Sequence, residues 1–161
     1  MNIVKTVSGA VLAVLVVLVA GCATGVQPGM SREQVIASYG APTRTVPLAS
    51  GTRLQYSAQP AGQWAIMVDL DAAGKVVSSR QVLNIQDFSR IEVDKWTRAD
   101  VEREFGRPAK VDGVISWPGD IMTYRWRDGV QDMFFFVYLD AGNVVRRVGQ
   151  GMEFPVRVND R

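Results

Sequence analysis

The chain lacks histidine entirely and has a single cysteine, Cys22, among its 161 residues. Intrachain disulfides, metal sites built from thiolates or imidazoles, Ser-His-Asp triads and Cys-His pairs are therefore excluded. Carboxylates remain, but they act as acids or bases only when a cleft holds them together. Because no pattern in the sequence indicates such a cleft, we predict a protein that is not an enzyme, with no catalytic residue, cofactor or metal site.

An excess of charge of either sign is also missing, because 18 Lys and Arg residues oppose 16 Asp and Glu residues. A nucleic-acid-binding protein would have a concentrated basic surface, so a nucleic-acid partner is not expected. A small-molecule substrate is not expected either. The segment from Asp69 to Gly74 superficially matches a calcium loop. In a calcium loop that starts at Asp69, however, position five would be Ala73 and the closing ligand position would be Arg80, so we predict a hairpin turn there.

An apolar run ends at Cys22. A short basic start over residues 1–5 precedes an apolar stretch over residues 7–20, which is the layout of a secretory signal. The stretch is shorter than the roughly 18 to 20 apolar residues that span a bilayer, which argues against an uncleaved anchor. The segment Val19-Ala20-Gly21-Cys22 resembles the lipobox of bacterial lipoprotein precursors, whose cysteine receives lipid. We expect a signal peptide over residues 1–21, a lipidated Cys22 and a tether over residues 22–29.

Two parts of the remaining chain repeat one another. Residues 30–42 recur as residues 96–108 with the same order of polar, apolar, glycine and proline positions, and residues 74–77 recur as 142–145. Such self-similarity indicates a duplicated unit. The predicted organisation is repeat 1 over residues 30–83, a connector over 84–95, repeat 2 over 96–152 and a tail over 153–161. In the tail, 156–158 alternate as in a short edge strand, and disorder is the alternative there.

Each repeat begins with the pattern of a short capped helix. Ser31 and Thr97 are typical helix N-caps, and Gly40 and Gly106 are expected to end the helices in a left-handed conformation. The predicted fold class is α+β, with two tandem repeats that each pack a short helix on a three- to four-stranded antiparallel sheet. Strands are predicted over residues 53–57, 63–70, 75–83, 121–127, 130–139 and 143–148, with weaker strands at 43–46 and 109–112.

These motifs resemble the SmpA/OmlA domain of BamE-like outer-membrane lipoproteins. The matching segments are Gly29-Met30-Ser31, Gly40-Ala41-Pro42 and Gly74-Lys75-Val76-Val77, and in the second repeat Gly106-Arg107-Pro108 and Gly142-Asn143-Val144-Val145. Lys95-Trp96 replaces the opening Gly-Met in the second repeat, and the family has one such domain where this chain has two. The arrangement of two units is similar to that of the β-lactamase inhibitor proteins.

The strand pattern suggests a partner-binding face in the second repeat. Residues 64, 66 and 68, and the corresponding residues 133, 135 and 137, should face the helices, with Trp64 in the core. The opposite face of the second repeat then carries Phe134, Phe136 and Tyr138, joined by Arg125 and Arg127 if Met122, Tyr124 and Trp126 point inward. Aromatic residues with arginine are typical of protein interfaces. The alternative, equally open here, is burial of the three rings against repeat 1 or the loop over residues 114–119.

We therefore expect a non-enzymatic outer-membrane lipoprotein with a protein-binding or scaffolding role in the cell envelope. The family resemblance implies an accessory role in outer-membrane protein assembly or envelope integrity. The alternative is an inhibitor-like module that binds the active site of a periplasmic or secreted hydrolase. Ala23 stands where enterobacterial lipoproteins retained at the inner membrane have aspartate, which favours a lipid-anchored position at the outer membrane, facing the periplasm.

Overall fold

The computed structural model describes residues 25–154. These residues form two four-stranded antiparallel sheets and three short helices, so the predicted mixed α+β class is confirmed. The lipidation prediction at Cys22 and the strand-like pattern over residues 156–158 lie outside the described residues. Within residues 25–154, no helix has the length and apolar character needed to cross a membrane.

Sheet 1 has the strand order β1-β2-β3-β4 and sheet 2 has the order β5-β6-β7-β8. The weaker strands predicted near residues 43–46 and 109–112 are present as β1 and β5. The first half contains α1 (Arg32–Tyr39), β1 (Arg44–Leu48), β2 (Gly51–Ser57), β3 (Ala65–Asp71) and β4 (Val76–Gln81). The second half contains α2 (Ile85–Phe88), α3 (Arg98–Phe105), β5 (Lys110–Asp112), β6 (Ile121–Asp128), β7 (Gln131–Leu139) and β8 (Val145–Met152).

Both α1 and α3 begin with the predicted capping box. The Ser31 hydroxyl accepts from the amide of Gln34 at 3.3 Å, and the Gln34 side chain accepts from the amide of Ser31 at 2.7 Å. Thr97 and Asp100 form the same reciprocal pair, with the Thr97 amide 2.8 Å from the Asp100 carboxylate. These contacts satisfy amides that have no partner inside a first helical turn, so each start is determined locally.

Glycine ends both helices, as predicted. Gly40 and Gly106 have φ values of 79° and 78° with ψ values of −167° and −169°. The positive φ is confirmed, but the ψ values lie outside the left-handed helical region. This combination is accessible essentially only to glycine, and it turns each chain from the helix directly into the sheet.

Each helix is tied to the last hairpin of its own sheet by main-chain hydrogen bonds. The same bonds occur in both halves, so each helix start is held against the strand that follows the last tight turn. The bonds join Arg32 N to Gly74 O (3.1 Å) and Val76 N to Met30 O (2.8 Å) in the first half, and Arg98 N to Asn143 O (2.9 Å) and Val145 N to Trp96 O (2.8 Å) in the second.

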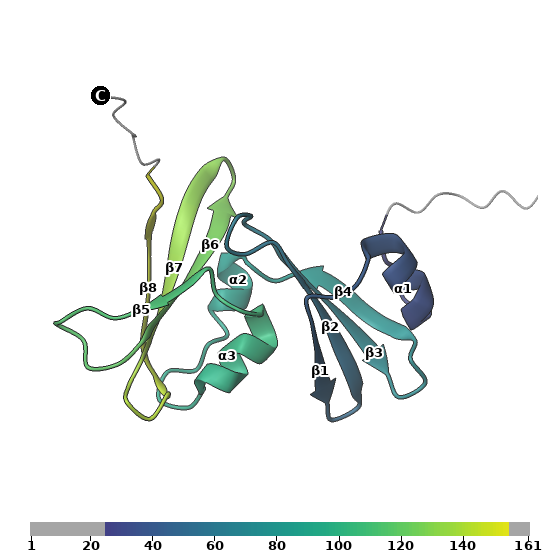
Figure 1. The fold of residues 1–161 in the computed structure, drawn as a ribbon, viewed down its shortest axis with the longest axis horizontal. Coiled ribbons are helices and arrows are strands. Elements are labelled where there is room, and N and C mark those ends of the chain that lie inside the picture. Colours follow the sequence, from purple (N-terminus) through teal and green to yellow (C-terminus); the bar gives the residue numbers. More distant parts are fainter. Residues whose placement is uncertain (1–24, 155–161) are drawn as a thin grey trace, which may run out of the picture.

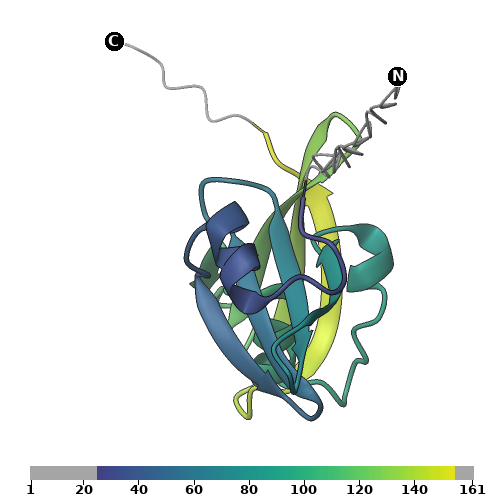
Figure 2. The same ribbon diagram turned by 90° about the vertical axis from the view of Figure 1, so that its right-hand side faces the viewer.

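The elements stack in the order α1, sheet 1, α2 and α3, sheet 2 (Figure 1). The view in Figure 2 looks onto sheet 1 from the side of α1, which lies across that face. Val35 of α1 packs in one cluster with Leu54 and Val68 of the sheet. The opposite face of sheet 1 is covered as well, because Ala65 and Met67 belong to a second cluster that includes α3. Both faces of sheet 1 therefore contribute side chains to the core.

Two polar residues of β2 reach the C-terminal end of α3. The amide of Gln55 donates to the carbonyls of Glu102 and Arg103 at 2.9 and 3.0 Å, and the guanidinium of Arg53 donates to the Arg103 carbonyl at 3.0 Å. The last carbonyls of a helix lack partners within it and carry partial negative charge, so an arginine here is favourable. A hydrogen bond to Asp69 raises the pKa of Arg53 above its ordinary value.

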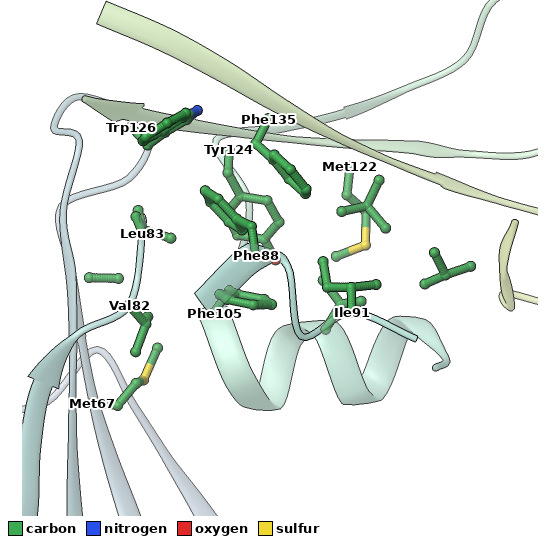
Figure 3. Packing of buried hydrophobic residues seen from close by; sticks show 14 of the residues in the cluster. Met67, Val82, Leu83, Phe88, Ile91, Phe105, Met122, Tyr124, Trp126 and Phe135 are labelled. Carbon is green, nitrogen blue, oxygen red and sulfur yellow. The ribbon is translucent and has the colours of Figure 1, made fainter. Parts of the chain in front are cut away.

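The segment predicted as a connector contributes to the core. It contains α2, whose Phe88 is 1% exposed and stacks on Phe135 with ring centroids 4.0 Å apart and an interplanar angle of 2°. Figure 3 shows Phe88 surrounded by side chains of sheet 2 and by Phe105 of α3. The inward positions predicted for Tyr124 and Trp126 are confirmed, since these residues are 0% and 2% exposed.

One core prediction is wrong. Trp64 was expected to face a helix, but it precedes β3, which begins at Ala65, and the tryptophan is 47% exposed. Strand β3 starts two residues later than the strand predicted over residues 63–70, so its alternation places no constraint on Trp64.

Candidate functional site

The face of sheet 2 that points away from α3 is the main uncovered surface of the fold. Among residues 25–154, no helix or strand lies on it (Figure 1). It contains an apolar groove of about 470 Å³ that runs over β6 beside the rings of β7. The residues that line this groove are Pro60, Ala109, Lys110, Asp112, Val114, Ile121, Thr123, Arg125, Phe134, Phe136 and Tyr138.

The register of the sheet explains why the three rings form one wall. Phe134, Phe136 and Tyr138 alternate along β7, so they share the outer face, and neighbouring ring centroids are 6.0 and 6.4 Å apart. On β8 the residues opposite the two phenylalanines are Gly151 and Gly149. A Cβ at Gly151 would stand 3.6 Å from Phe136, so the two glycines add no side chain over the rings on that side, and the three rings are half-buried.

Tyr138 is the one ring that the predicted loop covers. Trp117 lies across it at a centroid distance of 5.2 Å and an angle of 71°, and the indole N–H donates to the Leu139 carbonyl at 2.7 Å. The guanidinium carbon of Arg147 is 3.8 Å from the centre of the Tyr138 ring. Of the two alternatives, loop burial therefore applies in part to Tyr138, while Phe134 and Phe136 face the groove.

Arg125 lies at the other end of the groove, where it joins three parts of the chain. Its guanidinium pairs with Glu153 at 2.8 Å and donates to the carbonyls of Pro60 and Ala61, each at 2.8 Å. The predicted partner-binding arginine is thus held by intramolecular contacts. It fixes the hairpin between β2 and β3 against sheet 2 and closes this end of the groove.

A glutamine of the same hairpin completes the edge of β6. The side-chain amide of Gln59 accepts from the Arg125 amide at 3.1 Å and donates to the Arg125 carbonyl at 2.7 Å. Strand β5 pairs with β6 only from Ile121 to Thr123, so the backbone of Arg125 lies beyond its reach. Gln59 takes the place of a strand residue there, which connects the two halves at the groove.

Arg127 lies outside the groove. It is exposed, pairs with Asp132 at 3.2 Å, and borders a separate hollow that includes Trp64. Hydrogen bonds from Gln63 and Arg127 lower the pKa of Asp132 below its ordinary value. The structure therefore brings together four of the five predicted partner-binding residues and separates Arg127 from them.

Several carboxylates of the described residues make structural contacts. The Asp71 side chain accepts from the amides of Ala73 and Lys75 at 2.9 Å each, which is the predicted hairpin turn. Asp69 and Glu104 both pair with the buried Arg53, at 2.6 and 3.0 Å. Within residues 25–154, no group of three or more acidic or cysteine side chains is placed to hold a metal ion.

Three residues of the site were missed by sequence reasoning. Trp117 was not predicted as a site residue, although it lies in the loop over residues 114–119, which the sequence offered as one possible cover for the rings. Arg147 could have been found by extending the register from Tyr138 across to β8, where the two are paired. Gln59 left no signal, because a side chain that imitates a strand has no sequence periodicity.

No protein-family model and no curated protein matches this chain. Among solved structures, it is similar to a DUF4309 family protein (YjgB) from Bacillus subtilis, at 14% identity and a TM-score of 0.33, over 76% of this chain and 78% of that one. It is also similar to an extracellular protein containing a SCP domain from Bacillus anthracis, at 15% identity and a TM-score of 0.32. That match covers 94% of this chain and 50% of the other, so the chain spans about half of that protein's length. Neither likeness supports a conclusion about function.

Proposed function

We propose that this protein is a non-enzymatic, lipid-anchored module of the cell envelope that binds another protein through the groove of sheet 2. The observation that carries the proposal is the wall of Phe134, Phe136 and Tyr138 on a sheet face without a covering element in the described residues. The three rings are half-buried, and together they line the apolar groove. Apolar surfaces that remain in contact with solvent mark interaction sites, and aromatic residues dominate the energetics of protein interfaces.

The proposal includes a tandem pair of SmpA/OmlA (BamE)-like units. It is supported by the identical strand order of the two sheets, by the capping boxes of α1 and α3, and by matching turns at Asp71 and Asp140. In this arrangement the two units differ in function. The rear face of sheet 1 packs against α3, whereas the equivalent face of sheet 2 is left for a partner.

Anchoring through Cys22 would hold the module close to the membrane. Val26 is buried, with 6% of its surface exposed, in the cluster that contains Val35 and Leu54. The Gly29 amide donates to the Val76 carbonyl at 2.8 Å. Only the residues between Cys22 and Val26 therefore remain to act as a tether, with a reach of roughly 14 Å. A partner of the groove must come to the membrane surface, as an outer-membrane protein or a periplasmic protein that works there.

Site-specific photocrosslinking in the intact envelope tests the proposal. A photoreactive phenylalanine analogue at Tyr138 should crosslink one envelope protein, identified by mass spectrometry, whereas the same group at Val77 should not. Val77 is a matched control because it is 57% exposed on sheet 1, away from the groove. The identity of the captured protein distinguishes an assembly accessory from an inhibitor of a hydrolase.

The Phe136→Asp variant provides the decisive comparison. A charge on the ring wall should abolish the crosslink from position 138 while leaving the circular dichroism spectrum unchanged, because Phe136 lies on the outer face of the sheet. The equivalent Val77→Asp change should have no effect on capture. An undiminished crosslink in Phe136→Asp, or equal crosslinking from Tyr138 and Val77, would refute the groove as the binding surface.

A further inference from the structure

We infer that the groove binds an extended polypeptide segment that carries apolar side chains for the ring wall and a carboxylate for Arg147. This inference rests on the proposed function and specifies the chemistry of the partner. It is carried by two observations on the same sheet face: the length and direction of the groove, and an arginine, unpaired within residues 25–154, beside Tyr138, the ring at one end of the groove.

The groove is elongated and suits an extended chain. Its floor is made by Ile121, Thr123 and Arg125, which alternate along β6, so it follows the strand direction for about 14 Å. That length accommodates about four residues of an extended segment. Side chains of such a segment alternate in direction, so every second one would lie against Phe134 and Phe136.

The two ends of the groove differ. Pro60 closes one end, where Arg125 holds its carbonyl at 2.8 Å. The other end is lined by Tyr138 and by Val114 of the loop before β6, which is 49% exposed. One end of a bound segment would therefore lie beside Val114 and Tyr138, next to Arg147.

Charge complementarity indicates a carboxylate at that end. Around the groove, Lys110 pairs with Asp112 and Arg125 pairs with Glu153, so each of these charges has an opposite charge beside it. Arg147 lies on β8 opposite Tyr138, where it is exposed and makes no ion pair or side-chain hydrogen bond with residues 25–154. The guanidinium carbon of Arg147 lies 3.8 Å from the centre of the Tyr138 ring and 5.2 Å from the centre of the Trp117 ring.

Stacking prepares Arg147 for an anion. A guanidinium whose carbon lies 3.8 Å from a ring centre rests on that ring, keeps N–H donors for a bidentate carboxylate, and has already lost part of its side-chain freedom. An exposed lysine or an unstacked arginine would lose that freedom only on binding. Once a segment covers the neighbouring apolar rings, the local dielectric constant falls. This strengthens the ion pair between Arg147 and the carboxylate of the segment.

A random dodecapeptide library displayed on phage, selected on the full chain in detergent, tests this inference. Selection should enrich peptides with apolar residues two positions apart and an Asp or Glu beside them. A synthetic peptide from the selection should bind about three- to tenfold more weakly to Arg147→Gln, and replacement of its carboxylate by the amide should cost the same factor. The two changes together should cost little more than either alone, because they remove one interaction.

Each other outcome overturns the inference. Enriched peptides without an acidic residue, or equal affinity for wild type and Arg147→Gln, would remove the charge complementarity. Concentration-dependent dimers that Phe136→Asp dissociates would make a second copy the occupant, and enrichment only after removal of residues 155–161 would make the chain's own end the occupant. Absence of any enrichment would refute a peptide-like segment, while crosslinking from Tyr138 in the envelope would still decide the proposed function separately.

Discussion

Replacement of Phe88 by alanine tests whether residues 84–95 are a linker or a part of the core. In the structure the ring is 1% exposed and stacks on Phe135 at 4.0 Å. It also lies 5.1 Å from Phe105 and 5.9 Å from Trp126, between α3 and sheet 2. A flexible connector would lose almost nothing on truncation of this side chain, whereas a core segment would lose the fit between the two layers.

The expected cost follows from burial and stacking. Truncation of a buried phenylalanine to alanine destabilises a protein by about 3 to 5 kcal/mol, a range that includes the cavity left behind. The parallel stack on Phe135 places Phe88→Ala in the middle to upper part of that range, about 4 kcal/mol. Ile85, on the same helix, is 39% exposed, and its replacement by alanine should cost about 1 kcal/mol or less.

Urea unfolding followed by tryptophan fluorescence measures this difference, since Trp126 lies beside Phe88 in the core. With an m-value of about 2 kcal/mol/M, the midpoint should fall by about 2 M for Phe88→Ala and by less than about 0.5 M for Ile85→Ala. Equal, small shifts in the two variants would refute the reasoning. The segment would then be a linker, and α2 would not contribute to the core.

Two further predictions concern the cap of α3 and the anchor. The backbone hydrogen bond from Thr97 holds the pKa of Asp100 below its ordinary value. The ionised carboxylate therefore stabilises the fold at pH values above the unfolded pKa of about 3.9. This contribution is lost as the pH falls through the lower pKa of the folded state. Asp100→Ala should therefore lower the free energy of unfolding by about 1 kcal/mol at pH 7 and by progressively less as the pH falls below about 3.9, as measured by denaturation at several pH values; a cost that does not change with pH would contradict this. Cys22→Ala should abolish labelling by radioactive palmitate and release a folded protein from the membrane fraction, and unchanged sedimentation with membranes would disprove lipid anchoring.

Local patterns were sufficient for the elements themselves. Ser31 and Thr97 predicted the helix starts, because a capping box depends on residues three apart in sequence. The turn at Asp71 was predicted for the same reason, since its side chain bonds only to amides of the next few residues. Alternation along β6 correctly placed Tyr124 and Trp126 in the core.

Contacts between elements were beyond these patterns. Alternation distinguishes the two faces of a strand but does not say what covers either one, so the sequence could not determine that α3 packs on Met67 or that Phe136 borders an open groove. The same limit applied to Phe88, a lone ring in a polar segment, and to Gln59, whose partner is distant in the chain.

The sequence by itself determined the α+β class and the positions of caps, turns and strands, because these depend on neighbours within a few residues. Only the tertiary structure decided that sheet 1 is covered on both faces while sheet 2 has a free one. It also decided that Arg125 is used within the fold, whereas Arg147 is exposed, stacked on Tyr138. The physical reason is that coverage and charge pairing are set by how the two halves pack, which is a property of contacts between residues far apart in the chain.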